Sequence, residues 1–483
     1  MKIMLNQLLP DETNVPQLEV QGVSNDSRNV QPGDVYLAGP RLILDGRDYI
    51  GDARKMGAVA ILCEPPVPSL KLDIPLVEVR NLRAKTGNIA SRCYNNPSSK
   101  MLVIAITGTN GKTSCSHFIA QVLGSIKLKC GVIGTMGVGI PGALEDSAMT
   151  TPDPIELQKN LAALLDLSCN AVTLEASSHG LAQDRLIGTE VDIAIFTNIT
   201  RDHLDYHSSF DEYFASKKLL FSSFELKTAI INCDDEYGRE LCEFVSEAVS
   251  IYSFGIENKN ADVGCSDIEL NERGMSFNLQ TPWGSRPISS ELMGRFNIYN
   301  LLATAAVLGS QGLSIESIAQ ALQSLKTVKG RMEVIRHASI ATVIIDYAHT
   351  PDALEKALQA IKEHCTGALW CVMGCGGDRD IGKRPLMGEI ASRLADYLVI
   401  TDDNPRSESS SKIAEDIYAG IVAGSDVQVN TNRQSAIRRA LSKAKPEDIV
   451  LIAGKGHEEY QEIKGTKLSF SDHAVVLEFV GES

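Results

Sequence analysis

Residues 108–113 read GTNGKT, and this short segment constrains the fold more than any other part of the chain. It follows the apolar run MLVIAI at residues 101–106 and precedes a helical pattern. Backbone N–H groups in such a glycine-rich turn can converge on phosphate oxygens at the start of a helix. Lys112 would add a positive charge, and the hydroxyl of Thr113 suits Mg²⁺. The segment predicts a strand, a phosphate-binding loop and a helix that bind a nucleotide triphosphate.

The spacing of this loop departs from the common GxxxxGK[ST] pattern, which would place a glycine where Ile106 stands. The alternative interpretation is a glycine turn that only opens a helix. The order of Gly, Lys and Thr between a strand pattern and a helix pattern favours nucleotide binding. The predicted ATP contacts of the loop are Gly108, Thr109, Asn110, Gly111, Lys112, Thr113 and Ser114.

Apolar runs divide the 483 residues into three α/β regions. The first ends at the polar stretch NNPSSK, residues 95–100, and a hinge is expected at GRME, residues 330–333. After each of these points strand-like and helix-like runs alternate, as in a parallel sheet with covering helices. We predict a small α/β domain at residues 1–98, a central ATPase domain at 99–332 with short antiparallel strands between 255 and 290, and a Rossmann-like domain at 333–483.

Composition narrows the classes of partner. A net charge of −15 argues against nonspecific binding to nucleic acids or anionic membranes, so an anionic substrate needs a local cluster of basic groups. The 11 cysteines lack CxxC spacing, which is typical of free thiols in a reducing cytosol. The first residues are too polar for a signal peptide, and no 18-residue apolar run follows. We expect a cytoplasmic, monomeric protein with small-molecule substrates.

Reactive side chains follow several predicted strands, where open α/β sheets place their ligands. Glu175 ends the run AVTLEA and could hold Mg²⁺ with Thr113, although a glutamate at a strand end is commonly a solvated cap. His203 lies between carboxylates in TNITRDHLDYH, which suits a second cation or a hydrogen-bonded turn equally. Lys217 and Lys218 follow on a helix, where composition alone favours a solvated pair.

A series of motifs resembles the Mur ligase family in content and in order. The motifs are GTNGKT, TTPDP, EASSHGLAQDR, TNITRDHLDYH, YFASKKLLF, GRFNIYN, GRMEV, DYAHTPDAL, GGDRDIGKRPLM, DNPR and AGKGHE, with DSR and PGD near residue 30. This resemblance implies a three-domain ligase that binds a UDP-sugar peptide in its first domain, ATP in its second and an amino acid in its third. Within the family, the pattern is most similar to members that add meso-2,6-diaminopimelate to UDP-N-acetylmuramoyl-L-alanyl-D-glutamate in peptidoglycan synthesis.

The resemblance also implies roles for individual residues. Lys217 matches the family lysine that CO₂ converts to a carbamate (N6-carboxylysine), and the Mg²⁺ site would comprise Thr113, Glu175, His203 and that carbamate. The implied catalytic residues are Lys112, Glu175, His203 and Lys217. The implied further ATP contacts are Asn297, Asn300, Arg331, Asp346 and His349. The implied contacts of the UDP-sugar peptide are Ser27, Thr150, Thr151, Ser177, Gln183 and Arg185. The implied contacts of diaminopimelate are Arg379, Asp403, Asn404, Pro405, Arg406, Gly454 and Glu458.

Arg379 and Arg406 provide the sharpest prediction about the substrate. Together they could bind the distal carboxylate of meso-diaminopimelate, which L-lysine lacks. An Asx-Pro turn would explain Pro405 but not the two arginines. The alternatives are a lysine-adding ligase of the same family, a folylpolyglutamate synthetase-like ligase, and a nucleotide-dependent switch that catalyses no ligation.

Overall fold

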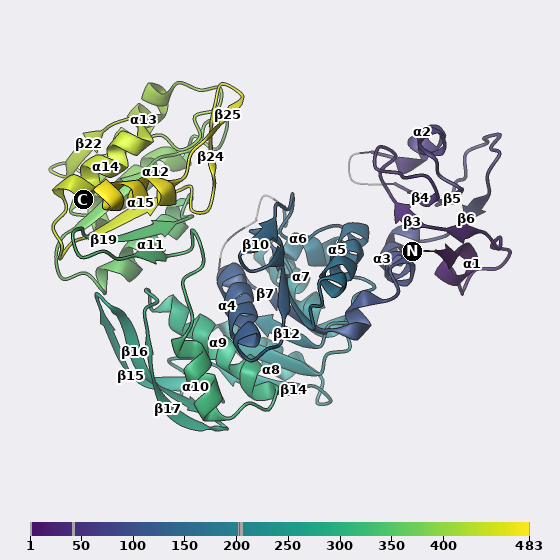
Figure 1. The fold of residues 1–483 in the computed structure, drawn as a ribbon, viewed down its shortest axis with the longest axis horizontal. Coiled ribbons are helices and arrows are strands. Elements are labelled where there is room, and N and C mark those ends of the chain that lie inside the picture. Colours follow the sequence, from purple (N-terminus) through teal and green to yellow (C-terminus); the bar gives the residue numbers. More distant parts are fainter. Residues whose placement is uncertain (1, 41–43, 201, 203–205, 483) are drawn as a thin grey trace. The chain divides into compact units, whose positions relative to one another are not determined.

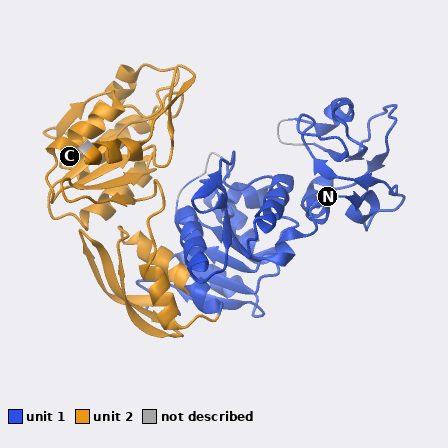
Figure 2. Ribbon diagram, viewed as in Figure 1, with its two compact units in different colours: residues 1–262, 306–311 blue, residues 263–305, 312–483 orange. Residues whose placement is uncertain are grey.

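The computed structural model describes residues 2–40, 44–200, 202 and 206–482. The chain separates into two compact units, residues 1–262 with 306–311 and residues 263–305 with 312–483 (Figure 2). Helices alternate with mainly parallel strands in both units (Figure 1), which confirms the predicted α/β class. Each unit is described by itself.

The first unit opens with a four-stranded parallel sheet of order β3-β4-β5-β6. Alternate residues of β4 enter two cores: Val35 and Leu37 pack with α1 and α3, whereas Tyr36 and Ala38 pack with α2. The elements are β1 (Ile3–Met4), α1 (Leu5–Leu8), β2 (Glu19–Val20), β3 (Gly22–Ser24), β4 (Asp34–Ala38), η1 (Gly46–Tyr49), α2 (Ile50–Met56), β5 (Ala60–Cys63), β6 (Leu76–Glu78) and α3 (Leu82–Cys93).

An eight-stranded sheet of order β10-β9-β8-β11-β7-β12-β13-β14 forms the centre of the first unit. The strands from β8 to β14 in this order are parallel to one another. At the other end of the sheet, β9 pairs antiparallel with both β8 and β10. Val103 and Ala105 of β7 face the core made with α5–α8, and α4 contacts the sheet through β7, β8 and β11.

The elements of this central region follow the sequence prediction closely. TAIIN forms β13, and MLVIAIT forms β7 from its second residue onward. The elements are η2 (Pro97–Lys100), β7 (Leu102–Thr107), α4 (Lys112–Ser125), β8 (Cys130–Gly134), β9 (Gly137–Ile140), β10 (Ala143–Glu145), α5 (Pro154–Asp166), β11 (Ala171–Glu175), α6 (Ser178–Ala182), β12 (Ile193–Phe196), α7 (Phe210–Ser222), β13 (Thr228–Asn232), α8 (Glu236–Phe244) and β14 (Ser250–Phe254).

Two glycines join the first region of this unit to its central region. A Cβ on Gly87 of α3 would lie 1.8 Å from the carbonyl oxygen of Ile187, and a Cβ on Gly188 would lie 2.3 Å from the carbonyl oxygen of Gly87. Real side chains never approach backbone so closely, so this contact requires glycine on both sides. Nearby, Glu190 N donates to Ser98 Oγ at 3.0 Å.

The second unit contains a three-stranded antiparallel sheet, which confirms the antiparallel strands predicted near residues 255–290. Its other sheet has six strands in the order β18-β19-β23-β20-β21-β22 and is parallel except for β18. Helices α11–α13 cover one face and α14–α15 the other. The sequence reasoning did not anticipate the hairpin β24–β25 or the helix α15.

The remaining elements lie at residues 264–482. They are β15 (Gly264–Asn271), β16 (Gly274–Thr281), β17 (Gly284–Ser290), α9 (Phe296–Ser310), α10 (Ile315–Gln323), β18 (Glu333–Ile335), β19 (Thr342–Asp346), α11 (Pro351–Lys362), β20 (Leu369–Met373), α12 (Lys383–Leu394), β21 (Tyr397–Ile400), α13 (Ser410–Tyr418), β22 (Asp426–Val429), α14 (Arg433–Lys443), β23 (Ile449–Ala453), β24 (Tyr460–Ile463), β25 (Thr466–Ser469) and α15 (Asp472–Glu482).

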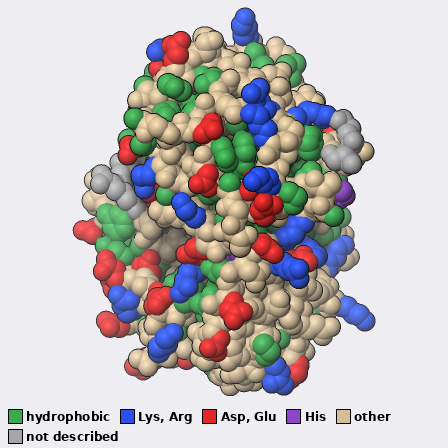
Figure 3. Space-filling model, turned by 90° about the vertical axis from the view of Figure 1, so that its left-hand side faces the viewer, with side chains coloured by type: hydrophobic (Ala, Val, Ile, Leu, Met, Phe, Trp, Pro, Cys, Tyr) green, Lys and Arg blue, Asp and Glu red, His purple; other side chains and the backbone are tan. Residues whose placement is uncertain are grey.

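The surface carries charges of both signs. On the face drawn in Figure 3, basic and acidic side chains are interspersed. Over the ranges that the structure describes, no helix has the length and apolar character needed to cross a bilayer.

Candidate active site

The phosphate loop connects β7 to α4, as predicted. Gly108 has φ +147°, and a Cβ there would lie 1.9 Å from Thr197 Oγ1, so only glycine fits. Gly111, with φ +87°, caps α4. The N–H groups of Thr109 and Asn110 donate to the backbone oxygen and side chain of Asn198, at 2.8 and 3.0 Å. These two donors are therefore engaged within the protein, so the predicted phosphate contacts of the loop backbone fall to its other N–H groups.

Lys112 and Thr113 open α4 beside this loop. The Lys112 ammonium donates to the carbonyl oxygens of Gly108 and Thr109 at 2.7 and 2.9 Å, so it is folded over the loop. Thr113 Oγ1 donates to Glu175 Oε2 at 3.0 Å. The sequence of the loop thus brings a cation and a hydroxyl to the same turn.

Glu175 is fully buried at the end of β11. Its Oε2 also accepts from Thr135 Oγ1, and its Oε1 accepts from Thr135 N, both at 3.0 Å. The solvated-cap interpretation of this glutamate is therefore wrong. Thr135 belongs to the same network and was missed by the sequence reasoning, because a threonine after a strand is common.

Lys217 lies on α7 and is only 1% exposed, so the solvated-pair interpretation fails for this lysine. Its ammonium lies 4.4 Å from the centre of the Tyr213 ring, and Tyr213 OH contacts Thr109 Oγ1 of the phosphate loop at 2.9 Å. Burial holds the pKa of Lys217 well below its ordinary value, the positive charge of Lys112 lowers it further, and Asp202 opposes both.

Lys218, in contrast, contacts Glu240 at 2.9 Å and lies over the Phe244 ring. The neighbouring lysines thus have different environments. His203, which was predicted as a ligand and catalytic residue, lies outside the described residues.

The oxygen donors present fit Mg²⁺ in part. The hydroxyl of Thr113 and the carboxylate of Glu175 are hard ligands of the kind that Mg²⁺ prefers. Among the residues that the structure describes, no group of three or more His, Cys, Asp or Glu side chains could hold a metal. A Mg²⁺ ion here would need further oxygens, from ATP, from water or from a carboxylated Lys217.

The residues predicted to contact the UDP-sugar peptide lie beside this network. Thr151 Oγ1 donates to the backbone oxygen of Glu175 at 2.7 Å and contacts Ser177 Oγ at 2.9 Å. Thr150 Oγ1 lies 3.0 Å from Thr135 Oγ1, which binds Glu175. Glu175 therefore connects the phosphate loop, through its side chain, to TTPDP, through its carbonyl.

Arg185 extends the same cluster. Its Nη1 donates to Thr151 O at 2.7 Å, and its Nη2 donates to Gln183 Oε1 at 2.7 Å. Gln183 Nε2 in turn donates to the hydroxyl of Tyr206 at 2.9 Å. Burial lowers the pKa of Arg185, although a guanidinium stays charged in proteins. Tyr206 is a further candidate contact that the sequence reasoning missed.

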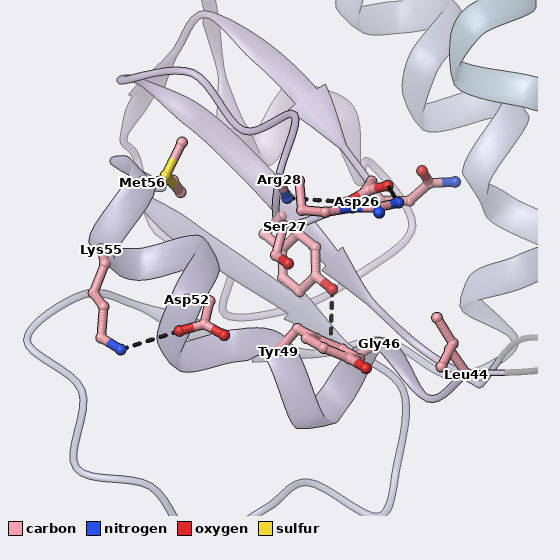
Figure 4. Close-up of a pocket in the computed structure, with 11 residues that line it drawn as sticks. Asp26, Ser27, Arg28, Leu44, Gly46, Tyr49, Asp52, Lys55 and Met56 are labelled. Carbon is pink, nitrogen blue, oxygen red and sulfur yellow. Dashed lines mark hydrogen bonds and ion pairs between the residues drawn. The ribbon is translucent and has the colours of Figure 1, made fainter. Parts of the chain in front are cut away.

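Ser27 lines a separate pocket of about 470 Å³ in the first region (Figure 4). Ser27 and Arg28, from the loop after β3, face Tyr49 of η1 across this pocket. Arg28 pairs with Asp26 at 2.6 Å. The pocket therefore offers an aromatic ring and charged groups, and Tyr49 and Arg28 were not singled out from the sequence.

In the second unit, the predicted ATP contacts form two groups. Asn297 and Asn300 are buried, and Asn300 Nδ2 donates to Asn297 Oδ1 at 2.9 Å. Asn297 lies in the first turn of α9, and its side-chain amide donates to Met293 O at 2.7 Å.

The other group gathers around Tyr347. The Arg331 guanidinium lies 4.8 Å from the centre of that ring, and the His349 ring lies 4.7 Å from it. Asp346 Oδ2 accepts from Met332 N at 2.8 Å, and burial raises the pKa of its carboxyl. Sequence reasoning named the flanking residues and missed Tyr347 itself.

The predicted amino-acid contacts come from loops that follow β20, β21 and β23. Asn404 Nδ2 donates to Glu458 Oε2 at 2.9 Å, and the ammonium of Lys455 donates to both Asn404 Oδ1 and Glu458 Oε2. Lys455 is fully buried, and its position in AGKGHE was the available signal. Asp403 lies against Gly454, where a Cβ would come within 2.6 Å of Asp403 Oδ2.

Arg379 and Arg406 flank Gly376, where a Cβ would lie 2.9 Å from Arg406 Nη1 and 3.6 Å from Arg379 Cγ. Arg379 is exposed. Arg406, which follows Pro405, has φ +50° and pairs with Glu462 of β24, Nε to Oε2 at 3.2 Å. Both arginines therefore lie near Gly376, and Arg406 already has a carboxylate partner from the unanticipated hairpin.

A fully buried ion pair anchors two of these loops. Arg433 Nε and Nη2 donate to the Asp472 carboxylate, both at 2.7 Å. The same guanidinium donates to the carbonyl oxygens of Asp402 and Ala453, at 3.2 and 3.0 Å. Arg433 therefore ties the beginnings of the DNPR and GKGHE loops to α15.

Comparison with known proteins agrees with these features. The Mur ligase family, catalytic domain, matches residues 19–94; the Mur ligase middle domain matches residues 106–308; and the Mur ligase, glutamate ligase domain, matches residues 330–456. The UDP-N-acetylmuramoyl-L-alanyl-D-glutamate–2,6-diaminopimelate ligase of Coxiella burnetii is 44% identical over 97% of this chain and 97% of its own length.

Solved structures show the same likeness. A structure of a ligase with that name is 35% identical, with a TM-score of 0.77, over 100% of this chain and 99% of its own. The folylpolyglutamate synthase of Mycobacterium tuberculosis, complexed with ADP and AMPPCP, has a TM-score of 0.62 at 19% identity over 77% of this chain and 92% of its own, which is a likeness of fold alone. With domain matches along most of its length and a relative of 44% identity, this chain belongs to the Mur ligase family.

Proposed function

We propose that this protein is an ATP-dependent ligase that adds meso-2,6-diaminopimelate to UDP-N-acetylmuramoyl-L-alanyl-D-glutamate, in peptidoglycan precursor synthesis. Relatives named for this reaction, alike over nearly the full length, support the proposal. The observation that carries it is the position of Glu175. Its carboxylate binds Thr113 of the phosphate loop, and its carbonyl binds Thr151 of the predicted peptide-binding segment. ATP and the carboxylate to be activated would thus meet at one residue.

The reaction begins when the D-glutamyl γ-carboxylate attacks the γ-phosphorus of ATP in line, which gives an acyl phosphate and ADP. The diaminopimelate amine then attacks the acyl carbon, and phosphate leaves from the tetrahedral intermediate as the amide forms. The protein supplies position and charge for these steps. Lys112 neutralises the outer phosphates, and Arg185 orients the peptide substrate through paired hydrogen bonds. Bound Mg²⁺, held by Thr113 and Glu175, would supply charge neutralisation at the phosphates.

Lys217 is proposed as a carbamate. Burial and the charge of Lys112 favour its neutral amine, which is the form that attacks CO₂. A C–N bond forms, the amine loses a proton to solvent, and the product is a carboxylate. This group would restore charge balance beside Lys112 and would add an oxygen ligand to the Mg²⁺ site. His203 is the remaining proposed ligand.

The amino acid is proposed to bind at the DNPR and GKGHE loops. Arg379 and Arg406 would take its distal carboxylate, and Glu458 with Asn404 would take an ammonium group. We further propose the three domains predicted above, with residue 330 as the hinge for closure, and a monomeric cytoplasmic enzyme. Small-angle scattering that shows no compaction with an ATP analogue and both substrates would contradict the closure.

Phosphate release tests the function directly. We expect release only when ATP, the UDP-sugar dipeptide and meso-diaminopimelate are all present, with much weaker turnover when L-lysine replaces the dicarboxylic amino acid. A mass spectrum should then show one new amide product. Equal turnover with L-lysine would favour the lysine-adding alternative. ATP hydrolysis without any amide product would favour a nucleotide-dependent switch.

A further inference from the structure

The loops that carry Arg379 and Arg406 are tied together by the residues next to those arginines. Asp378 directly precedes Arg379, and Ser407 directly follows Arg406. Ser407 Oγ donates to Asp378 Oδ1 at 2.5 Å, and Ser407 N donates to Asp378 Oδ2 at 3.2 Å. One carboxylate therefore accepts hydrogen bonds from both the hydroxyl and the backbone N–H of Ser407. We name this Asp378–Ser407 contact the clasp.

A buried arginine, Arg384, binds the glutamate that accepts a hydrogen bond from the backbone of Asp378. Glu408 Oε1 accepts from Asp378 N at 2.5 Å, and the same carboxylate receives both Nη groups of Arg384 at 2.8 and 3.0 Å. Arg384 lies on α12, is fully buried and also pairs with Asp416 at 2.9 Å. Glu408 thus fixes the loop after β21 to α12. The N–H of Asp378 fixes the loop after β20 to the same glutamate.

Backbone geometry also singles out these positions. Asp378 and Arg406 have φ values of +54° and +50°, a conformation that is unfavourable for residues other than glycine. Such conformations persist where surrounding contacts determine them, and they concentrate at binding sites. Further contacts across the two loops are Gly377 N to Asn404 O at 2.9 Å and Arg406 Nη1 to Gly377 O at 2.8 Å.

We propose that Asp378 and Ser407 are positioning residues that set the separation of the Arg379 and Arg406 guanidinium groups. This inference rests on the proposed function and deepens it, because it assigns the choice of a dicarboxylic amino acid to the clasp as well as to the arginines. Two long, like-charged side chains bind one carboxylate tightly only if their backbones are held in register. The negative charge of Asp378 also offsets the repulsion between them; the pKa of its carboxyl is lowered mainly by Ser407 and less by Arg406 and Arg379.

Steady-state kinetics of the full-length enzyme test the proposal with Ser407→Ala and Asp378→Asn. Both side chains are exposed, so the fold should persist, and a thermal melt checks this. We expect KM for meso-diaminopimelate to rise about threefold for Ser407→Ala and about tenfold for Asp378→Asn, the latter equivalent to about 1.4 kcal/mol. KM for ATP and for the UDP-sugar dipeptide, kcat, and kcat/KM for L-lysine should stay unchanged. Ser407→Thr, which keeps the hydroxyl, should restore the wild-type KM.

Ser253→Ala provides a matched control. Ser253 of β14 makes the same pair of contacts to an aspartate, with its Oγ and its N donating to Asp262 Oδ2 at 2.6 and 2.8 Å. We expect no change in any KM for this variant.

The outcomes separate the clasp from the function on which it rests. If the wild type couples meso-diaminopimelate but both clasp variants keep its KM, the positioning role is refuted and the function stands. If the clasp variants raise KM for all substrates together, the contact is merely structural and the proposal is also refuted. A wild type that makes no amide with meso-diaminopimelate refutes the proposed function and the clasp with it.

Discussion

Replacing Asp472 by asparagine should destabilise the third α/β region strongly. The side chains of Asp472 and Arg433 are both 0% exposed, and the carboxylate receives two charge-assisted hydrogen bonds of 2.7 Å. Asparagine keeps the shape but removes the carboxylate charge that pairs directly with the buried guanidinium. Breaking a buried pair by removing one partner costs about 3–5 kcal/mol, whereas exposed pairs contribute about 0.2–1 kcal/mol.

The assay can use one tryptophan as a local reporter. The chain has two tryptophans, and Trp370 packs in the same core as Ala436 and Ile437 of α14, the helix that begins at Arg433. In a Trp283→Phe background, fluorescence during heating therefore reports this region. For a unit of this size, a loss of about 3–5 kcal/mol lowers the midpoint by roughly 6–20 °C.

Asp352→Asn is the control, because Asp352 also lies in the first turn of a helix but pairs with Lys356 in an exposed position. Its midpoint should fall by less than about 4 °C. Equal shifts in the two variants would refute the argument from burial. Replacing Arg433 and Asp472 together by methionine and leucine should recover part of the loss, since no unpaired charge remains, although the carbonyl oxygens of Asp402 and Ala453 lose a donor.

Three further predictions concern the candidate active site. Lys217→Ala should lose nearly all ligation, and added formate or acetate should restore part of it by supplying the missing carboxylate; full activity of the unsupplemented variant would remove Lys217 from the site. Gly108→Ala should abolish binding of an ATP analogue in calorimetry, because the new Cβ would lie 1.9 Å from Thr197 Oγ1 at φ +147°. Unchanged affinity would contradict the close packing of the loop. Arg185→Lys should raise KM for the UDP-sugar dipeptide about tenfold through loss of paired hydrogen bonds, with KM for ATP unchanged, and an equal rise in both constants would point to a structural role.

Much of the fold follows from local patterns in the sequence. TAIIN and DVYLA coincide with β13 and β4, because β-branched and apolar runs between turn-forming residues have few other stable conformations. Antiparallel strands were also expected between residues 255 and 290, and they lie at residues 264–290. The hairpin β24–β25 was missed because its residues are half-buried or exposed and carry no apolar run.

The sequence predicted those site residues that follow parallel strands, because such strands end at the same edge of a sheet. Glu175, Thr151 and Ser177 come together because TTPDP and the segment after β11 meet at the end of that strand. The partners of the site residues were not predictable in the same way. Glu462 reaches Arg406 only because β24 lies beside residue 406, and Asp378 meets Ser407 only because β20 and β21 are neighbours. Such contacts depend on the tertiary arrangement and leave no spacing in the sequence.

The glycine contact between α3 and residue 188 bears on protein engineering. Gly87 and Ile187 approach with no side chain between them, and Gly188 meets the carbonyl of Gly87 from the other side. Consider a chimera whose first hundred or so residues, about the size of a typical domain, come from a homologue. Such a chimera must carry glycine at positions 87 and 188. A single alanine at either position would force the two backbones apart, so recombination sites for exchanging the first region should be chosen so that both glycines are inherited together.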